Sequence, residues 1–192
     1  KSFVNNQTID LIQWYNRSQT NLLSPEGIAL TNSLETIKKA DLYILAVSDD
    51  MISSISKKLP LDILLIHTAG SISIDELSRH TRRGVWYPIQ SFNNKQEIDF
   101  SEVTFGIETS KLSDKQLIYK LTNSIKAKSI DINSKQREKL HLAAVIVNNF
   151  TNHLFTQASL FCKDNSLSFD LLRPLIRETF NKIDKISPHD AQ

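Results

Sequence analysis

The uninterrupted apolar run Leu42-Tyr43-Ile44-Leu45-Ala46-Val47 is followed further along the chain by a second one, Ile63-Leu64-Leu65-Ile66. Runs of this kind are typical of strands that are buried on both faces, as in parallel sheets covered by helices. Residues 51–59 and 74–79 lie after these runs and have the pattern of crossover helices. The sequence therefore predicts a mostly parallel sheet with helices on its faces.

Five further segments continue the alternation of strand and helix signals. A helical turn is expected at residues 34–39, and strands are expected at Ile9–Trp14, Gly27–Thr31, Val85–Tyr87 and Val103–Ile107. This order is typical of an α/β fold with a Rossmann-type, doubly wound sheet.

The second half of the chain changes character. A helix is expected at 114–124, a possible last strand at 129–132, and a long helix from Ser134, a good N-cap, to about Cys162. A second helix is predicted over 169–183, capped by Ser168, in which Pro174 indicates a kink or a later start. We therefore predict a Rossmann-like domain at 1–133 and an all-α domain at 134–192.

The composition of the 192-residue chain is ordinary for a soluble globular protein, with 40% hydrophobic and 23% charged residues. A net charge of +2 gives no reason to expect nucleic-acid binding. The longest apolar runs are too short to span a membrane, and no signal-peptide pattern is present at the start. The single cysteine, Cys162, cannot form an internal disulfide, which fits a cytoplasmic protein.

Polar segments follow four of the predicted strands. In open parallel sheets, ligands bind at the carboxyl ends of the strands, so we expect these segments to converge on one rim. They are Tyr15-Asn16-Arg17-Ser18, Ser48-Asp49-Asp50 after Val47, His67-Thr68-Ala69-Gly70-Ser71, and Pro88-Ile89-Gln90-Ser91-Phe92.

Arg17 follows the first predicted strand, at the place where dinucleotide-binding domains recognise the ribose. An acid at this place binds the 2′-hydroxyl of NAD, whereas an arginine suits the 2′-phosphate of NADP. Its planar guanidinium can bind a phosphate, and Asn16 and Ser18 can add neutral hydrogen bonds. The alternative is a solvated loop arginine with no ligand, and Arg17 alone does not decide between the two.

The next two polar segments also have structural interpretations. Asp49 or Asp50 can cap the following helix, which does not exclude backbone contact with a cofactor. His67 can be a hydrogen-bonded structural residue, while Gly70 permits a sharp turn or a close ligand approach. A metal site is not expected, because the five histidines show no metal-binding spacing.

The long predicted helix carries an unusual polar set. Arg137, His141, Asn148 and Asn152 share a face on a regular helix, and Asn149 pairs with His153 beside it. Most of their neighbours are apolar, and an unpaired amide is costly to bury. These side chains therefore need partners, which the sequence leaves open as a substrate, a second subunit or another helix.

Together, several motifs resemble the Rossmann-like proteins that carry the C-terminal domain of unknown function 2520. These motifs are Tyr15–Ser18, Ala46–Asp50, His67–Ser71, Tyr87–Phe92, His141–His153 and Leu171–Ile176. Members of this family are often named NADP-dependent oxidoreductases of the F420-dependent type. They are similar in layout to ketopantoate reductase, pyrroline-5-carboxylate reductase and 6-phosphogluconate dehydrogenase.

The resemblance implies an N-terminal dinucleotide-binding domain and a helical C-terminal domain that often forms a homodimer, with the substrate between them. It also implies a strand with a glycine-rich, pyrophosphate-binding loop before Lys1, and further residues after Gln192. We expect both to lie outside the sequence given.

These observations predict an NADP(H)-dependent reductase or dehydrogenase. It would transfer a hydride between the nicotinamide and a small carbonyl, imine or hydroxy-acid substrate. Arg17 with its neighbours would hold the 2′-phosphate, and residues 47–49 and 67–71 would line the nicotinamide. His141 is the expected proton donor, and Asn148, Asn149 and Asn152 are expected to orient the substrate.

Two alternatives belong to other classes. A non-catalytic NADP(H)-binding sensor or scaffold would use the helical domain to dimerise, and turnover of a reducible substrate separates it from the enzyme. A methyltransferase that uses S-adenosylmethionine would normally have an acid where Arg17 stands, which argues against it.

Overall fold

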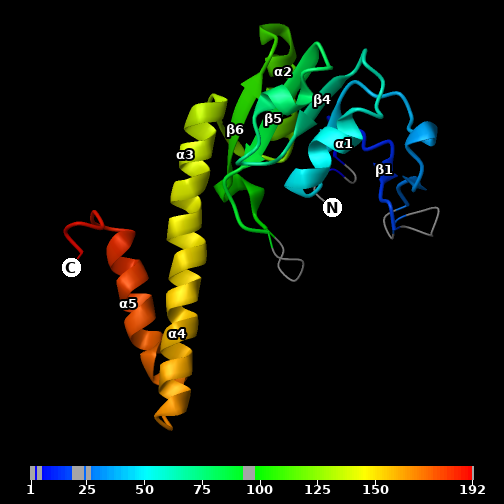
Figure 1. Cartoon of the computed structure of the whole chain (residues 1–192). Helices are drawn as coiled ribbons and strands as arrows, with labels where there is room; N and C mark the ends of the chain where they lie inside the picture. The colour runs from blue at the N-terminus through cyan, green and yellow to red at the C-terminus, as the bar shows by residue number, and fades with distance from the viewer. Residues whose placement is uncertain (1–2, 4–5, 19–23, 25–26, 93–97, 192) are drawn as a thin grey trace. The chain divides into compact units, whose positions relative to one another are not determined.

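The computed structural model describes residues 3, 6–18, 24, 27–92 and 98–191 (Figure 1). The chain divides into two compact units, residues 1–143 and 144–192. The larger unit contains a five-stranded sheet with the order β3-β4-β5-β6-β7. Its strands are β3 Tyr43–Leu45, β4 Leu64–His67, β5 Arg82–Pro88, β6 Thr104–Thr109 and β7 Lys128–Asp131. Neighbouring strands are parallel except β5 and β6, which confirms the mostly parallel α/β fold.

A separate two-stranded parallel sheet contains β1 Trp14–Tyr15 and β2 Leu30–Thr31. Both strands are shorter than the sequence predicts, and they form at the carboxyl ends of the expected segments. The short 3-10 helix η1, Leu34–Thr36, follows β2 at the expected helical turn.

Strand β4 explains the apolar run that indicates the fold. Leu64 and Ile66 pack in a cluster with the helix α2, Leu112–Ser124, whereas Leu65 packs in a second cluster with Ile52 and Leu77. Both Ile52 and Leu77 come from the connections after β3 and β4. These connections comprise η2 Asp49–Met51, α1 Ile52–Ser56 and η3 Ile74–Leu77. Each fully buried Leu or Ile contributes about 1.5–3 kcal/mol, so β4 must be apolar on both faces.

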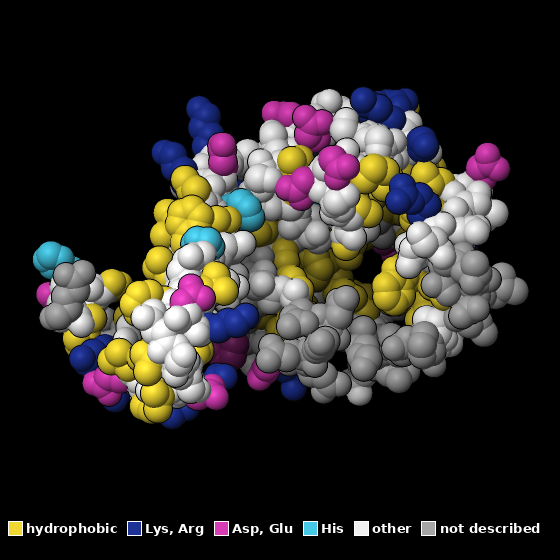
Figure 2. Space-filling model, turned by 60° about the horizontal axis from the view of Figure 1, so that its bottom comes forward, with side chains coloured by type: hydrophobic (Ala, Val, Ile, Leu, Met, Phe, Trp, Pro, Cys, Tyr) yellow, Lys and Arg dark blue, Asp and Glu magenta, His cyan; other side chains and the backbone are white. Residues whose placement is uncertain are grey.

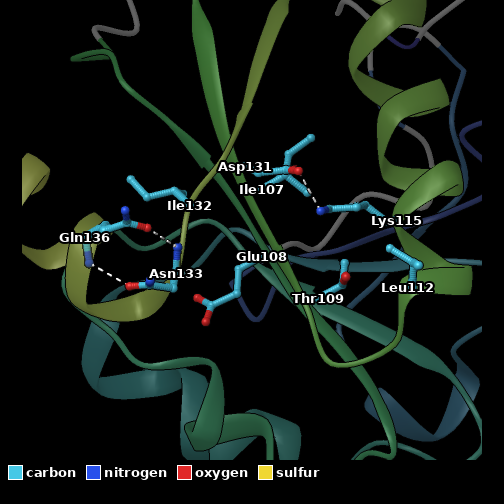
Figure 3. Close-up of a pocket in the computed structure, with 9 residues that line it drawn as sticks. All are labelled: Ile107, Glu108, Thr109, Leu112, Lys115, Asp131, Ile132, Asn133 and Gln136. Atoms are coloured by element: carbon cyan, nitrogen blue, oxygen red, sulfur yellow. Dashed lines mark hydrogen bonds and ion pairs between the residues drawn. The ribbon is translucent and has the colours of Figure 1, made fainter.

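The helix α3, Ser134–Val145, has Asn133 as its N-cap. The Gln136 backbone N–H donates to Asn133 Oδ1 at 2.9 Å, and the Asn133 N–H donates to Gln136 Oε1 at 3.1 Å (Figure 3). This reciprocal pair is a capping box. The expectation that Ser134 is the N-cap is therefore wrong by one residue.

The long helix continues from α3 through a π-helical turn, η5 Ile146–Phe150, into α4, Thr151–Asp164. A π-turn has a wider hydrogen-bond repeat than an α-helix, so the 3.6-residue periodicity is interrupted there. The steps counted on a regular helix consequently do not apply between His141 and Asn152.

The smaller unit contains α4, the 3-10 helix η6, Phe169–Leu172, and α5, Arg173–Ile183. Figure 1 shows α4 and α5 side by side, and the rings of Phe155 and Phe180 are in contact at 6.1 Å. The Ser168 side chain caps η6 as predicted, and Pro174 stands at the start of α5, where a proline is tolerated. In the described part of the chain, no helix has the length and apolar character needed to cross a membrane.

Candidate functional site

The polar segments after β3 and β4 are in contact. Because these strands are parallel, both segments leave the same edge of the sheet. Ser71 Oγ donates to Asp49 Oδ2 at 2.6 Å, and the Thr68 backbone N–H donates to the Leu45 carbonyl at 3.3 Å. The N-cap of η2 is Ser48, so neither Asp49 nor Asp50 is the N-cap, but both acids stand in the first turn of this helix. Two of the predicted rim segments therefore meet.

His141 lies against the end of β5. Its Nδ1 is 3.2 Å from the hydroxyl of Tyr87, and the two rings meet edge to face with their centroids 5.9 Å apart. Tyr87 is buried, and burial raises its pKa above the usual value, while the charge of Arg137 opposes that rise. The phenol therefore stays neutral at physiological pH. The sequence missed Tyr87 as a site residue, although its place at the end of an apolar strand was a signal.

Gly70 makes the close approach of His141 possible. A Cβ atom at Gly70 would lie 2.5 Å from His141 Nδ1 and 2.8 Å from Tyr87 Cε2. Contacts below about 3 Å force neighbouring atoms to move, and both neighbours are ring atoms. The close approach observed at Gly70 is made by a side chain of the protein itself, and a close ligand approach there stays a prediction.

Arg137 connects the elements around this contact. It is 1% exposed, and its guanidinium donates to the Glu108 carboxylate on β6 and to the Ile72 carbonyl in the segment after β4. Glu108 also accepts from the Ser134 backbone N–H at 3.0 Å and from the Ser134 hydroxyl at 2.9 Å. The ion pair therefore fixes the start of α3 on the sheet. Glu108 was not predicted, but an acid that ends a buried strand is a usable signal.

His67 is fully buried at the end of β4, and its Nδ1 accepts from the Ala69 backbone N–H at 3.2 Å. Burial lowers its pKa from 6.5 to about 4; the charge of Arg137 also lowers it, against smaller opposing effects from Ser73 and Asp49. The ring is therefore neutral near neutral pH. This geometry is that of the hydrogen-bonded structural histidine considered from the sequence, and its side chain does not reach the surface.

The segment Asn16-Arg17-Ser18 lies on the separate two-stranded sheet. The Ser18 N–H donates to Asn16 Oδ1 at 3.2 Å, and the Asn16 N–H donates to the Thr31 carbonyl at 3.0 Å. All three side chains are exposed, and the ion pairs formed among described residues do not include Arg17. The parallel pairing also brings Thr31 beside this turn, with its hydroxyl bonded to the Ser33 N–H at 3.1 Å. The sequence did not indicate that Thr31 and Ser33 lie beside the turn Asn16-Arg17-Ser18, because only the pairing of β1 with β2 brings them near it.

Asn148, Asn149 and Asn152 belong to the smaller unit and are all exposed. Asn148 Nδ2 donates to Asn149 Oδ1 at 3.2 Å within the π-turn. Their predicted burial among apolar neighbours is therefore not observed, and they carry no burial cost that a partner must offset. π-turns occur frequently at functional sites, which keeps these amides of interest.

An open pocket of about 420 Å³ lies between β6, β7 and the starts of α2 and α3 (Figure 3). Its charged groups already have partners: Lys115 pairs with Asp131 at 2.7 Å, and Glu108 pairs with Arg137. Nothing in the pocket therefore calls for a charged ligand. No group of three or more potential metal ligands occurs in the described ranges.

Comparison with known proteins finds the domain of unknown function DUF2520 at residues 103–192. A solved structure from Bacteroides fragilis, described as a candidate NADP oxidoreductase, has 32% sequence identity and a TM-score of 0.78, covering 95% of this chain and 74% of that chain. A Thermotoga maritima protein has 24% identity and a TM-score of 0.70, covering 87% and 66%. Plasmodium falciparum pyrroline carboxylate reductase, solved with NADP bound, has 17% identity and a TM-score of 0.66, covering 97% and 73%. No curated protein sequence matches this chain.

These likenesses define a Rossmann-like α/β protein with a helical C-terminal region. The chain belongs to the same family as the Bacteroides fragilis protein and contains the domain DUF2520. It spans about two thirds to three quarters of the length of these structures, from 66% to 74%.

The buried His67 predicts a loss of stability in acid. Its folded-state pKa lies below the unfolded value, so its contribution is fully present above about pH 6.5 and is lost as the pH falls towards 4. The loss should reach about 3 kcal/mol of unfolding free energy, measured by urea unfolding across that window. In His67→Asn, whose Oδ1 can accept from Ala69, the free energy of unfolding that is lost over the same pH window should be smaller by that amount. An identical loss in both proteins would contradict the assignment.

The contact of Gly70 with His141 predicts a local effect of Gly70→Ala. The added methyl group should displace the His141 ring and lower the free energy of unfolding by about 1–3 kcal/mol. The His141 signals in an NMR spectrum should shift. Gly106→Ala, whose methyl group would crowd Ile132 instead, should destabilise the protein without moving those signals. Unmoved His141 signals in Gly70→Ala would show that the contact does not form.

Proposed function

We propose that this protein is an NADP(H)-dependent oxidoreductase that transfers a hydride between the nicotinamide and a small carbonyl, imine or hydroxy-acid substrate. The main observation behind this proposal is the contact of His141 with Tyr87 and Gly70, beside the carboxyl ends of β4 and β5. Ligands of open parallel sheets bind at this edge, and a histidine is a suitable proton donor there. Membership of a family with a candidate NADP oxidoreductase supports the same chemistry.

The cofactor in this proposal is NADP. The exposed turn Asn16-Arg17-Ser18 offers a guanidinium, an amide and a hydroxyl to the 2′-phosphate, which suits the geometry of phosphate recognition. The segments Val47-Ser48-Asp49 and Thr68–Ser71, joined by the bond between Ser71 and Asp49, would line the nicotinamide. His67 would contribute through its backbone alone, since its side chain is buried. The NADP bound by the Plasmodium falciparum reductase is consistent with this choice.

His141 is the proton donor in this proposal. The exposed amides of Asn148, Asn149 and Asn152 can both donate and accept hydrogen bonds, as orientation of a polar substrate requires. The cofactor carries the hydride chemistry, so the protein has to supply the orientation of the substrate and the proton.

We further propose a homodimer formed through the helical unit. Cys162 is its single buried apolar residue among those described, whereas many large apolar side chains are exposed (Figure 2). On α4, Leu154 and Phe161 are 66% and 68% exposed and lie two helical turns apart on one face. Apolar surface of this kind marks an interaction site, and a second copy with two-fold symmetry is the commonest arrangement.

The same apolar surface favours a second candidate function. A non-catalytic sensor or scaffold would bind NADP(H) through the larger unit and dimerise through the helical unit. Both candidates require NADP(H) binding, and turnover of a carbonyl or imine substrate separates them.

The cofactor proposal predicts selective binding of NADPH over NADH by the full-length protein. Arg17→Ala should weaken NADPH binding about tenfold or more, the usual effect of losing a charge-assisted hydrogen bond, and leave NADH unchanged. A fluorescence titration measures both. Arg177→Ala, which removes another exposed arginine, should have no effect. Equal affinity for the two nucleotides, or no binding of either, would contradict the proposal.

The dimer proposal predicts that Leu154→Glu dissociates the protein. Placing a charge in an apolar interface without a partner costs several kcal/mol, so the variant should be monomeric in sedimentation velocity. Thr156→Glu places the same charge at an exposed position of α4 that points away from the face of Leu154 and Phe161, and this variant should stay dimeric. A monomeric unmodified protein would refute the proposal.

A further inference from the structure

The contact between His141 and Tyr87 has a direction, because the two ring nitrogens are not equivalent. Nδ1 faces the Tyr87 hydroxyl at 3.2 Å. Among the described residues, the ring forms its hydrogen bond through Nδ1, so Nε2 is the nitrogen left to exchange a proton with a ligand or solvent. The 3.2 Å distance lies at the upper end of the range of about 2.7–3.2 Å for N–H···O hydrogen bonds, so the geometry permits Nδ1–H to be the donor.

The position of the ring is restricted on two sides. Gly70 lies against Nδ1 and Cγ of His141, so closely that an added Cβ would come within 2.5 and 2.8 Å of these atoms. One helical turn earlier on α3, Arg137 is fixed to Glu108 on β6 and to the Ile72 carbonyl. Helix α3 therefore cannot slide along the sheet without breaking a buried ion pair, and His141 stays opposite Tyr87.

We propose that Tyr87 is a positioning residue that accepts a hydrogen bond from His141 Nδ1–H and so reserves Nε2 for proton transfer. This inference rests on the proposed function. A hydroxyl oxygen can accept this bond whether or not Nε2 is protonated, so the ring keeps its orientation throughout a reaction cycle.

The chemical step then balances. In the reductive direction, NADPH would supply a hydride to the carbonyl or imine carbon, and His141 would give the proton on Nε2 to the substrate oxygen or nitrogen. The products would be NADP⁺ and the alcohol or amine. The ring becomes neutral with its Nδ1–H still bonded to Tyr87, and solvent returns a proton to Nε2.

The direct test is the tautomer of His141 in the free protein. Long-range ¹H–¹⁵N correlation spectra of ¹⁵N-histidine-labelled protein distinguish the Nδ1–H from the Nε2–H form of a neutral ring, and His141→Gln assigns the signals. We expect the Nδ1–H form in the unmodified protein. In Tyr87→Phe, which keeps the ring but loses the hydroxyl, the Nε2–H form should appear.

The matched control is Tyr119→Phe. Tyr119 donates to Asp131 at 2.6 Å, so this variant also loses one phenolic hydrogen bond in the same unit, and it should leave His141 unchanged. An Nε2–H tautomer in the unmodified protein would overturn the inference. So would an Nδ1–H tautomer that persists in Tyr87→Phe. Neither result depends on NADPH binding, so a failure here is distinct from a failure of the proposed function.

Kinetics provide a second readout once a substrate turns over. Tyr87→Phe should lower kcat by roughly tenfold to a hundredfold, part of what a positioned acid contributes, with KM for NADPH unchanged. Tyr119→Phe should retain kcat. A Tyr87→Phe protein with full kcat would overturn the positioning role even if the tautomer changed.

Discussion

The buried ion pair between Arg137 and Glu108 is the interaction on which the site depends. A guanidinium that is 1% exposed is costly to desolvate, and only fixed partners offset that cost. Glu108 accepts from Arg137 and twice from Ser134, and the Ile72 carbonyl takes a further guanidinium N–H. Removing Glu108 would leave the charge of Arg137 buried without an anionic partner. Helix α3 consequently has one stable position along the sheet.

That position determines which residues can form the site. Arg137 contacts the segment after β4 and strand β6, and β5 lies between β4 and β6 in the sheet. One turn further along α3, His141 therefore meets Tyr87 from β5 and Gly70 from the segment after β4. The absence of a side chain at Gly70 is a packing requirement, since the residue does not adopt a positive φ. The ion pair of Arg137 and the missing side chain at Gly70 thus bring together residues that are far apart in sequence.

The pattern of apolar residues predicted most of the strands and helices, because the buried positions of β4 and of the helices are apolar in the sequence. The run Ile63–Ile66 is apolar throughout since β4 packs on both faces. The π-turn was not predictable from a 3.6-residue pattern, since it depends on backbone hydrogen bonding. Glu108 and Tyr87 were missed for a different reason. Each lies one residue before the end of its strand, and their partners are on α3. Only the register of the sheet shows that these ends face one helix.

The charges around His141 also follow from burial. Burial and the charge of Arg137 keep His67 neutral, and burial keeps the Tyr87 phenol neutral. Arg137 is the nearby permanent charge, and Glu108 balances it. The partner that holds His141 is accordingly an uncharged hydroxyl, which can fix the direction of a ring without adding a fixed negative charge beside it.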